Sequence, residues 1–283
     1  MTPHSRRLLK VCASALFVLL LAGVTYQGVA TALERRTFKY PGRLVPVGDH
    51  QLHIYCIGTG TPTTVLEAPA LGFSGSWSLV QNELAKDVRV CAYDRAGLGW
   101  SEASERPFNP RRIPEELEAL LLGAGETAPY LLVGDGLGAA YVTEFAGLYP
   151  VEAAGLVLLD APQRAEFASG AVVRRPSPSP WLARIGVLRV ARLFSGDTAA
   201  LPGPPTGAVR AFSTRPDHLT RAAQEIRQLD AIVARAAATT LPAELPVRRF
   251  ESPDARPLLA APAQADQVTR LVQEAIRDFR AHP

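Results

Sequence analysis

The chain has 283 residues, of which 47% are hydrophobic and 20% charged, so a disordered or fibrous protein is excluded and a sizeable core is expected. The net charge is +3, and the basic excess lies within the first 43 residues. The remaining body is slightly acidic and lacks the basic surface that nucleic acid requires, so we expect no nucleic-acid partner.

Residues 1–40 are predicted to form a membrane anchor or a signal segment. Residues 11–33 carry no charge, and about 20 apolar residues span a bilayer, so we expect residues 11–33 to contact the lipid bilayer. The preceding basic residues and an A-x-A pattern ending at Ala32 are also typical of a signal peptide. The preferred interpretation is an uncleaved anchor with the body outside the cytoplasm. The alternatives are a protein secreted after cleavage near Ala32, and a buried core helix.

Residues 41–160 alternate between strand and helix patterns. Strands are predicted at 43–47, 51–57, 63–67, 88–93, 130–133 and 155–159, and helices at 76–84, 114–123 and 138–148. This alternation indicates an α/β fold whose sheet is mostly parallel and covered on both faces.

The pattern changes after Asp160. Residues 161–242 combine proline-rich breaks with helical patterns at 181–194 and 219–236, which predicts a helical cap inserted over the sheet. Residues 243–283 then return to the core, with a strand at 247–250 and an amphipathic closing helix.

Two stretches carry a family resemblance. One runs from Tyr93 to Ser101 (YDRAGLGWS) and the other from Leu131 to Gly138 (LLVGDGLG), each directly after a predicted strand. Together with the LHIYC run and the strand end Val65–Ala68, they resemble α/β-hydrolase-fold proteins of the lipase, esterase and epoxide-hydrolase type. The resemblance covers about residues 40–162 and implies an α/β-hydrolase sheet with a helical cap.

In that family the fifth strand ends in a nucleophile elbow, G-x-S-x-G, whose serine attacks the substrate. The corresponding residues here run from Gly134 to Gly138, and the nucleophile position is Gly136. Glycine has no atom that can attack a carbonyl, although it suits a strained turn. Asp135 stands one residue before the apex and is expected to point away. We therefore predict no catalytic nucleophile.

The other catalytic elements of the resemblance are also altered. No histidine lies on a loop just before the closing helix, where the family places its base; the five histidines are His4, His50, His53, His218 and His282. The oxyanion donors would be the backbone N–H groups of Leu137 and Ala70, but Pro69 stands where the family usually has glycine. Asp254 is at most a remnant of the acid.

These losses predict a membrane-tethered, non-hydrolytic protein. Ala70 and Leu137 would then belong to a vestigial oxyanion pocket that binds a small apolar or acyl-like ligand. The first alternative is an active ester hydrolase that uses an unrecognised set of residues, so enzymatic activity is left open. The oligomeric state is left open as well.

The second alternative is dinucleotide binding. Gly134-x-Gly136-x-x-Ala139 fits the fingerprint G-x-G-x-x-G/A, and Asp160 stands near the expected ribose-binding position. That fingerprint normally lies in the first βαβ unit, whereas several strands precede it here. We therefore expect no cofactor and no binding of NAD or NADP.

Cys56 and Cys91 lie in the predicted second and fourth strands, which are neighbours in the strand order of the family. A disulfide between them is expected if the register aligns them and the body lies in an oxidising compartment. Two buried free thiols are the alternative. The cysteine spacing fits no metal site.

Overall fold

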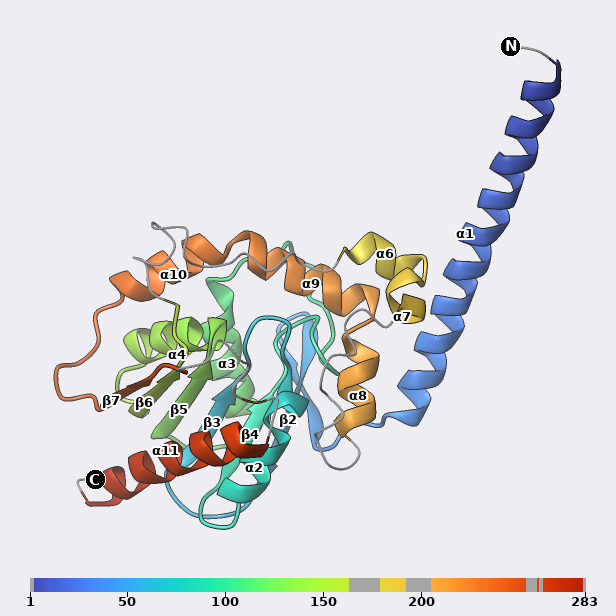
Figure 1. The fold of residues 1–283 in the computed structure, drawn as a ribbon. Helices are drawn as coiled ribbons and strands as arrows, with labels where there is room; N and C mark the ends of the chain where they lie inside the picture. Colours follow the sequence, from blue (N-terminus) through green and yellow to red (C-terminus); the bar gives the residue numbers. More distant parts are fainter. Residues whose placement is uncertain (1–2, 163–178, 192–204, 253–258, 260–261, 282–283) are drawn as a thin grey trace.

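The computed structural model describes residues 3–162, 179–191, 205–252, 259 and 262–281. Its centre is a seven-stranded sheet in the order β1-β2-β4-β3-β5-β6-β7 (Figure 1). The strands are β1 (Arg43–Val47), β2 (His50–Ile57), β3 (Thr63–Glu67), β4 (Val90–Tyr93), β5 (Tyr130–Asp135), β6 (Ala153–Leu159) and β7 (Val247–Phe250). Only β2 pairs antiparallel, with β1 and with β4, so the predicted mostly parallel sheet is confirmed.

Helices cover both faces of the sheet. On one face lie α3 (Arg112–Gly123) and α4 (Leu137–Leu148), and on the other lie α2 (Ser78–Leu84) and α11 (Pro262–Ala281) (Figure 1). Successive strand residues face opposite sides: Leu132 packs toward α3 and α4, whereas Val133 packs toward α2 and α11. A single turn of 3₁₀ helix, Ser74–Trp77, precedes α2.

Between β6 and β7, the described residues 179–191 and 205–238 contain five helices, which form the cap over the carboxyl edge of the sheet (Figure 1). They are α6 (Pro180–Arg184), α7 (Val187–Ala191), α8 (Pro205–Phe212), α9 (Pro216–Arg227) and α10 (Leu229–Ala238). The prediction of one helix over 181–194 is wrong, because Gly186 adopts a φ of 74° and separates α6 from α7. Residues 192–194 lie outside the described residues. The predicted helix at 219–236 is likewise divided, at Gln228.

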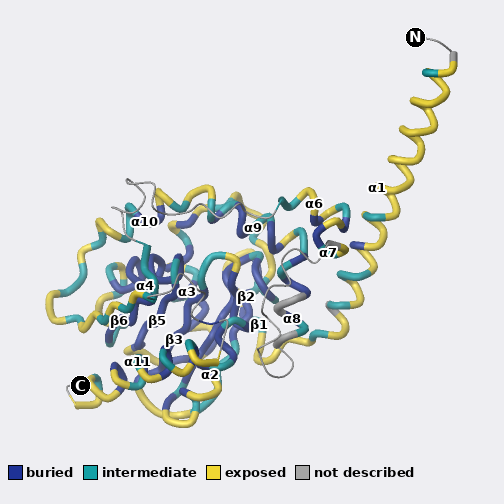
Figure 2. Tube along the Cα trace, in the orientation of Figure 1, coloured by how far each residue is buried: buried dark blue, intermediate teal, exposed yellow. Residues whose placement is uncertain are grey.

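The helix α1 (Pro3–Thr37) is longer than the predicted apolar segment, and its first half extends away from the body (Figures 1 and 2). Its stretch His4–Glu34 is long and apolar enough to cross a membrane, with a mean hydropathy of 2.2 over its most apolar 18 residues. The second half contacts the cap, however. Gln27 is buried and donates to the carbonyl of Thr214, and Arg189 pairs with Glu34. Within the stretch 11–33 that was predicted to contact lipid, Gln27 thus has protein partners.

Cys56 and Cys91 are direct partners in the register between β2 and β4, and a disulfide joins them with a Cα–Cα distance of 4.0 Å. This is the pairing considered from the sequence. A carboxylate oxygen of Glu126 lies near both sulfurs. Because disulfide sulfurs are not thiolates, this group does not have the ligands of a metal site.

Candidate functional site

The turn between β5 and α4 has the geometry of a nucleophile elbow without a side chain at its apex. Gly136 adopts φ 53° and ψ −118°, which glycine tolerates and other residues adopt only with strain. A Cβ on Gly134 would lie 2.6 Å from the backbone of Ala139, so glycine there allows α4 to approach β5 closely. The motif therefore provides a sharp turn and close helix packing, but no atom that can attack a substrate.

Two carboxylates lie at the carboxyl ends of the neighbouring strands β5 and β6, beside the elbow. Asp135, the last residue of β5, is buried, and burial together with the charge of Asp160 raises the pKa of Asp135 to about 7. Asp160 follows β6 and accepts a hydrogen bond from the backbone N–H of Ser252 at 2.6 Å. Burial also raises the pKa of Asp160. The pair places a titrating carboxyl group one residue before the empty apex.

The histidines closest to the cap and the first strands already have structural partners. In α9, Nδ1 of His218 accepts the N–H of Gly99 at 3.1 Å, and Nε2 lies 3.0 Å from the carbonyl of Leu71. Burial lowers the pKa of His218, and these two bonds fit a neutral ring that donates from Nε2. The side chain connects the cap to the loop after β3. It cannot serve as a base without losing one of these bonds.

His53 in β2 forms a second buried polar group. Its Nδ1 lies 2.9 Å from the carboxylate of Asp94, and both side chains are fully buried. Burial opposes the charged ring, but the carboxylate outweighs it and raises the pKa of His53. Asp94 also accepts the backbone N–H groups of Ser74 and Trp100. This pair fixes the loops after β3 and β4 and lies on strands away from the elbow.

The predicted oxyanion residues lie inside a packed apolar cluster. Leu137 is buried and belongs to one cluster with Ile113, Tyr141 and the cap residue Ile232, and Ala70 packs against that cluster. The loop after β3 is thus covered by the cap. Gly136 itself remains half-buried.

A buried ion network fixes the same loop. Arg95 follows β4, and its guanidinium donates to Glu67 of β3 at 2.5 Å and to both carboxylate oxygens of Glu225 of α9 at 2.9 Å. It also donates to the carbonyls of Ala68 and Pro69. All three charged side chains are at most 1% exposed. Burial opposes the charge on Arg95, but Glu225 and Glu67 raise its pKa well above the usual value.

We call this network of Glu67, Arg95 and Glu225 the Arg95 clamp. It was not predicted from the sequence. Arg95 was noted within YDRAGLGWS, but Glu225 lies 130 residues further along the chain. The sequence signal for this network is Glu67, an acid at the end of a buried strand, because a buried carboxylate needs a cation as its partner. The clamp ties the cap to the core beside the elbow.

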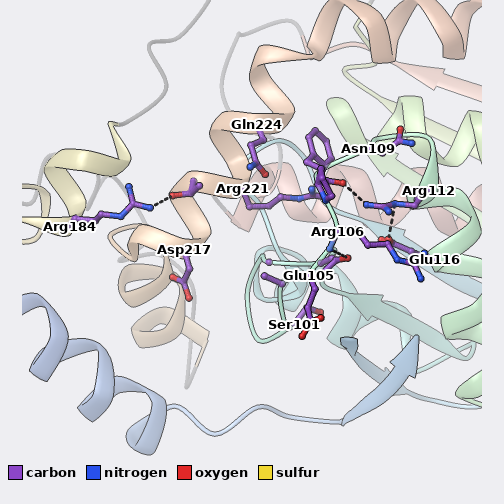
Figure 3. A pocket seen from close by; sticks show the side chains of 17 residues that line it. Ser101, Glu105, Arg106, Asn109, Arg112, Glu116, Arg184, Asp217, Arg221 and Gln224 are labelled. Carbon is purple, nitrogen blue, oxygen red and sulfur yellow. Dashed lines mark hydrogen bonds and ion pairs between the residues drawn. The ribbon is translucent and has the colours of Figure 1, made fainter. Parts of the chain in front are cut away.

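A polar cavity of about 460 Å³ lies next to the clamp, between the loop after β4, α3 and α9 (Figure 3). Arg221 extends from α9 into this cavity, with its Cζ 3.8 Å from the ring centroid of Phe108. Its nearest acid is Glu225, at 3.5 Å. Arg112 of α3 lines the same cavity and lies 4.0 Å from Glu116. Among the described residues, Nε of neither arginine has a hydrogen-bond partner.

The chain matches the sequence pattern of the alpha/beta hydrolase family over residues 58–282, more than three quarters of its length. The chain belongs to the α/β hydrolase family. Among curated relatives, it is 29% identical to the uncharacterized protein C23C11.06c of Schizosaccharomyces pombe, over 56% of this chain and 36% of that protein. It is 26% identical to the uncharacterized protein YbdG of Bacillus subtilis, over 45% of this chain and 40% of that protein. It thus spans less than half the length of these relatives.

Two solved structures show the same fold. The epoxide hydrolase CorEH superimposes with a TM-score of 0.61 at 16% identity, covering 84% of this chain and 98% of that chain. A membrane phospholipase A superimposes with a TM-score of 0.58 at 16% identity and covers 99% of both chains, so the likeness includes most of α1. The expected α/β-hydrolase fold with an apolar N-terminal helix is confirmed.

Against the usual requirements of an α/β hydrolase, the structure places Gly136 at the nucleophile position and brings Ala70 and Leu137 into one cluster. Asp254 and His282 lie outside the described residues. The residues that the structure adds are the Arg95 clamp, His218 and the two arginines of the cavity.

Proposed function

We propose that this protein is a membrane-anchored member of the α/β hydrolase family that binds a ligand and does not hydrolyse esters. The observation that carries the proposal is the backbone of Gly136, which keeps the elbow turn with no nucleophilic side chain. The partners of His218 and His53 support it, because both ring nitrogens of each histidine already have hydrogen-bond or ion-pair partners.

For the ligand, we propose a small anion with an apolar, acyl-like part. Arg221 and Arg112 line the cavity, and the Nε of each has no hydrogen-bond partner among the described residues, although an acid lies within 4.0 Å of each. Arginine suits carboxylates and phosphates. Phe108 lines the same cavity and also packs against the apolar cluster of Ala70 and Leu137. An acyl chain bound there would meet apolar side chains while its charged end meets the arginines.

A related solved structure supports binding without the serine. It is a serine-to-glycine mutant of the N-acyl homoserine lactonase AidH in complex with N-hexanoyl homoserine lactone. That chain superimposes with a TM-score of 0.59 at 15% identity, covering 84% of this chain and 99% of its own. In that protein, the serine-to-glycine change is compatible with a bound acyl ligand.

For the anchor, we propose that the part of α1 before Gly23 crosses the bilayer. Residues 4–22, at 1.5 Å per residue, extend about 28 Å, close to the hydrocarbon thickness of a membrane. Arg6, Arg7 and Lys10 lie near the start of this stretch, where their long side chains can reach the headgroups. Cleavage near Ala32 would remove Gln27 and its bonds to Thr214 and Arg189, so the contacts favour an uncleaved helix. The disulfide favours a body in an oxidising compartment outside the cytoplasm.

Hydrolysis is tested with the full chain in detergent, on short p-nitrophenyl esters, beside a family member that keeps its serine. We expect turnover no faster than the buffer and detergent blank. Enzyme-dependent turnover would support the alternative of an ester hydrolase with an unrecognised set of residues. Micromolar binding of NAD or NADP by calorimetry would instead support the dinucleotide alternative.

Binding is tested by thermal shift with octanoate and with octanol as its uncharged analogue. We expect octanoate to raise the melting temperature more than octanol, and Arg221→Gln to abolish the difference. Arg106→Gln is the matched control, because Arg106 lies on the rim of the same cavity and is 63% exposed. Equal shifts for the two compounds would contradict an anionic ligand.

A further inference from the structure

The cap carries a group of exposed apolar side chains on its two shortest helices. Trp181 and Leu182 of α6 and Val187 and Val190 of α7 are all exposed, Trp181 by 69% and Val190 by 72%. We call these four residues the cap patch. The opposite faces of the two helices point inward, where Ala183 and Leu188 pack with Leu219 of α9. The side chains of the cap patch therefore take no part in the core of the cap and stay exposed.

The helices α6 and α7, which carry the cap patch, lie beside α1 where α1 leaves the body (Figure 1). A Cβ on Gly23 would collide with the carbonyl of Ile185, between α6 and α7, so the helices meet at close range there. The turn at Gly186 packs against Gly23 and Tyr26. On α7, Arg189 faces α1 and binds Gln27 and Glu34. This contact fixes the cap patch relative to the helix axis.

The length of α1 places the membrane boundary at the same level. About 28 Å of helix precedes Gly23, with Arg6, Arg7 and Lys10 near its start, and none of the most apolar 18-residue window of α1 is buried against the body (Figure 2). If that part crosses the hydrocarbon layer, Gly23 lies at the lipid–water interface. Ile185 and Gly186 then lie there too, and the cap patch beside them faces the membrane.

We propose that the cap patch inserts into the interfacial layer of the bilayer that α1 crosses, as a second and shallower membrane contact. The inference rests on the anchoring by α1 proposed above. Tryptophan favours this layer, because its ring is apolar and its N–H can bond to water or headgroups. Two contacts on one bilayer would orient the body and hold the cap against the membrane surface, which a single helix alone does not do.

The test uses tryptophan fluorescence of the full chain in phosphatidylcholine vesicles, with and without bromine on the acyl chains. The sequence has only three tryptophans; Trp77 is fully buried and Trp100 is half-buried in the body. We expect brominated lipid to quench the wild-type emission, and Trp181→Phe to lose most of that quenching. Sedimentation of the vesicles in alkaline carbonate is measured on the same samples.

A matched pair of variants sharpens the test. Val190→Ser lies in the cap patch, whereas Val151→Ser changes a side chain that is 89% exposed on the core. We expect the first to weaken quenching of Trp181 and the second to leave it unchanged.

The outcomes separate the two proposals. Quenching that is the same in wild type and Trp181→Phe, in vesicles that retain the protein, overturns the membrane contact of the cap patch and leaves the anchor standing. Release of the chain by carbonate overturns the anchor. A Trp181 emission that shifts with protein density but is not quenched by bromine would assign the cap patch to a second copy of the chain, against the proposal.

Discussion

The elbow and the Arg95 clamp lie side by side at the carboxyl edge of the sheet, and they differ in what their polar groups do. At the elbow the turn remains but Gly136 offers no reactive atom. In the clamp, Arg95 is fully buried with two carboxylates, one from the core and one from the cap. The buried charged groups at this edge of the sheet thus join the cap to the core.

The largest effect is expected on breaking the clamp. Glu225→Ala leaves the buried guanidinium of Arg95 with one carboxylate, and loss of one partner of a buried pair costs about 3–5 kcal/mol. Urea unfolding followed by circular dichroism measures the loss. Glu83→Ala is the control, since its pair with Lys86 is exposed and contributes at most about 1 kcal/mol. Equal losses in the two variants would contradict a clamp.

The disulfide tests the sheet itself, where it joins the neighbouring strands β2 and β4. Replacing both Cys56 and Cys91 by serine opens a loop of 35 residues, and we expect a loss of about 3–4 kcal/mol on the chain-entropy estimate. Reductant should lower the stability of the wild type and leave the double variant unchanged. Cys12→Ser, in the exposed part of α1, controls for the third cysteine. Free thiols at Cys56 and Cys91 in protein purified without reductant would contradict the bridge.

Asp135, beside the elbow, is expected to make the stability of the protein depend on pH. Its pKa of about 7 exceeds the usual 3.8, so between these values the folded protein holds a proton that the unfolded chain has lost. Stability contributed by this group therefore falls as the pH rises from about 4 to about 7. Asp135→Asn removes that penalty, and we expect a gain of about 2–4 kcal/mol at pH 8 and little change at pH 4. A stabilisation independent of pH would contradict the raised pKa.

Gly136→Ser is expected to have the smallest effect on stability. A non-glycine residue at φ 53° strains the backbone and lowers the free energy of unfolding by about 1 kcal/mol. The Cβ itself adds no clash, because its nearest neighbour would be Pro69 at 3.5 Å. The hydroxyl should not restore ester turnover, because a serine without a base is a weak nucleophile. Gly136→Ala carries the same backbone strain without the hydroxyl. Turnover that rises by orders of magnitude in the serine variant alone would reveal a base.

Much of the fold could be predicted from the sequence because its signals are local. Strand patterns and the glycines around Gly136 place β5 and α4, and the strand order implied by the family brings Cys56 beside Cys91. The break at Gly186 was missed because a single glycine in an apolar pattern also occurs inside helices.

The candidate site was less predictable because its contacts join distant parts of the chain. Glu225 reaches Arg95 across 130 residues, and Gln27 bonds to Arg189 and Thr214, 162 and 187 residues further along the chain. Periodicity cannot indicate such pairs. The uncharged run through Gln27 therefore suggested lipid contact, whereas the tertiary structure gives this polar side chain protein partners.

The central claim, that this α/β hydrolase fold has no catalytic nucleophile, is tested most directly by a fluorophosphonate probe and intact mass spectrometry. The full chain in detergent is incubated with excess probe beside a family member that keeps its serine. We predict that the mass of this chain stays unchanged while the control gains one phosphonyl group. A stoichiometric adduct on any residue of this chain, lost on heat denaturation before labelling, would contradict the account.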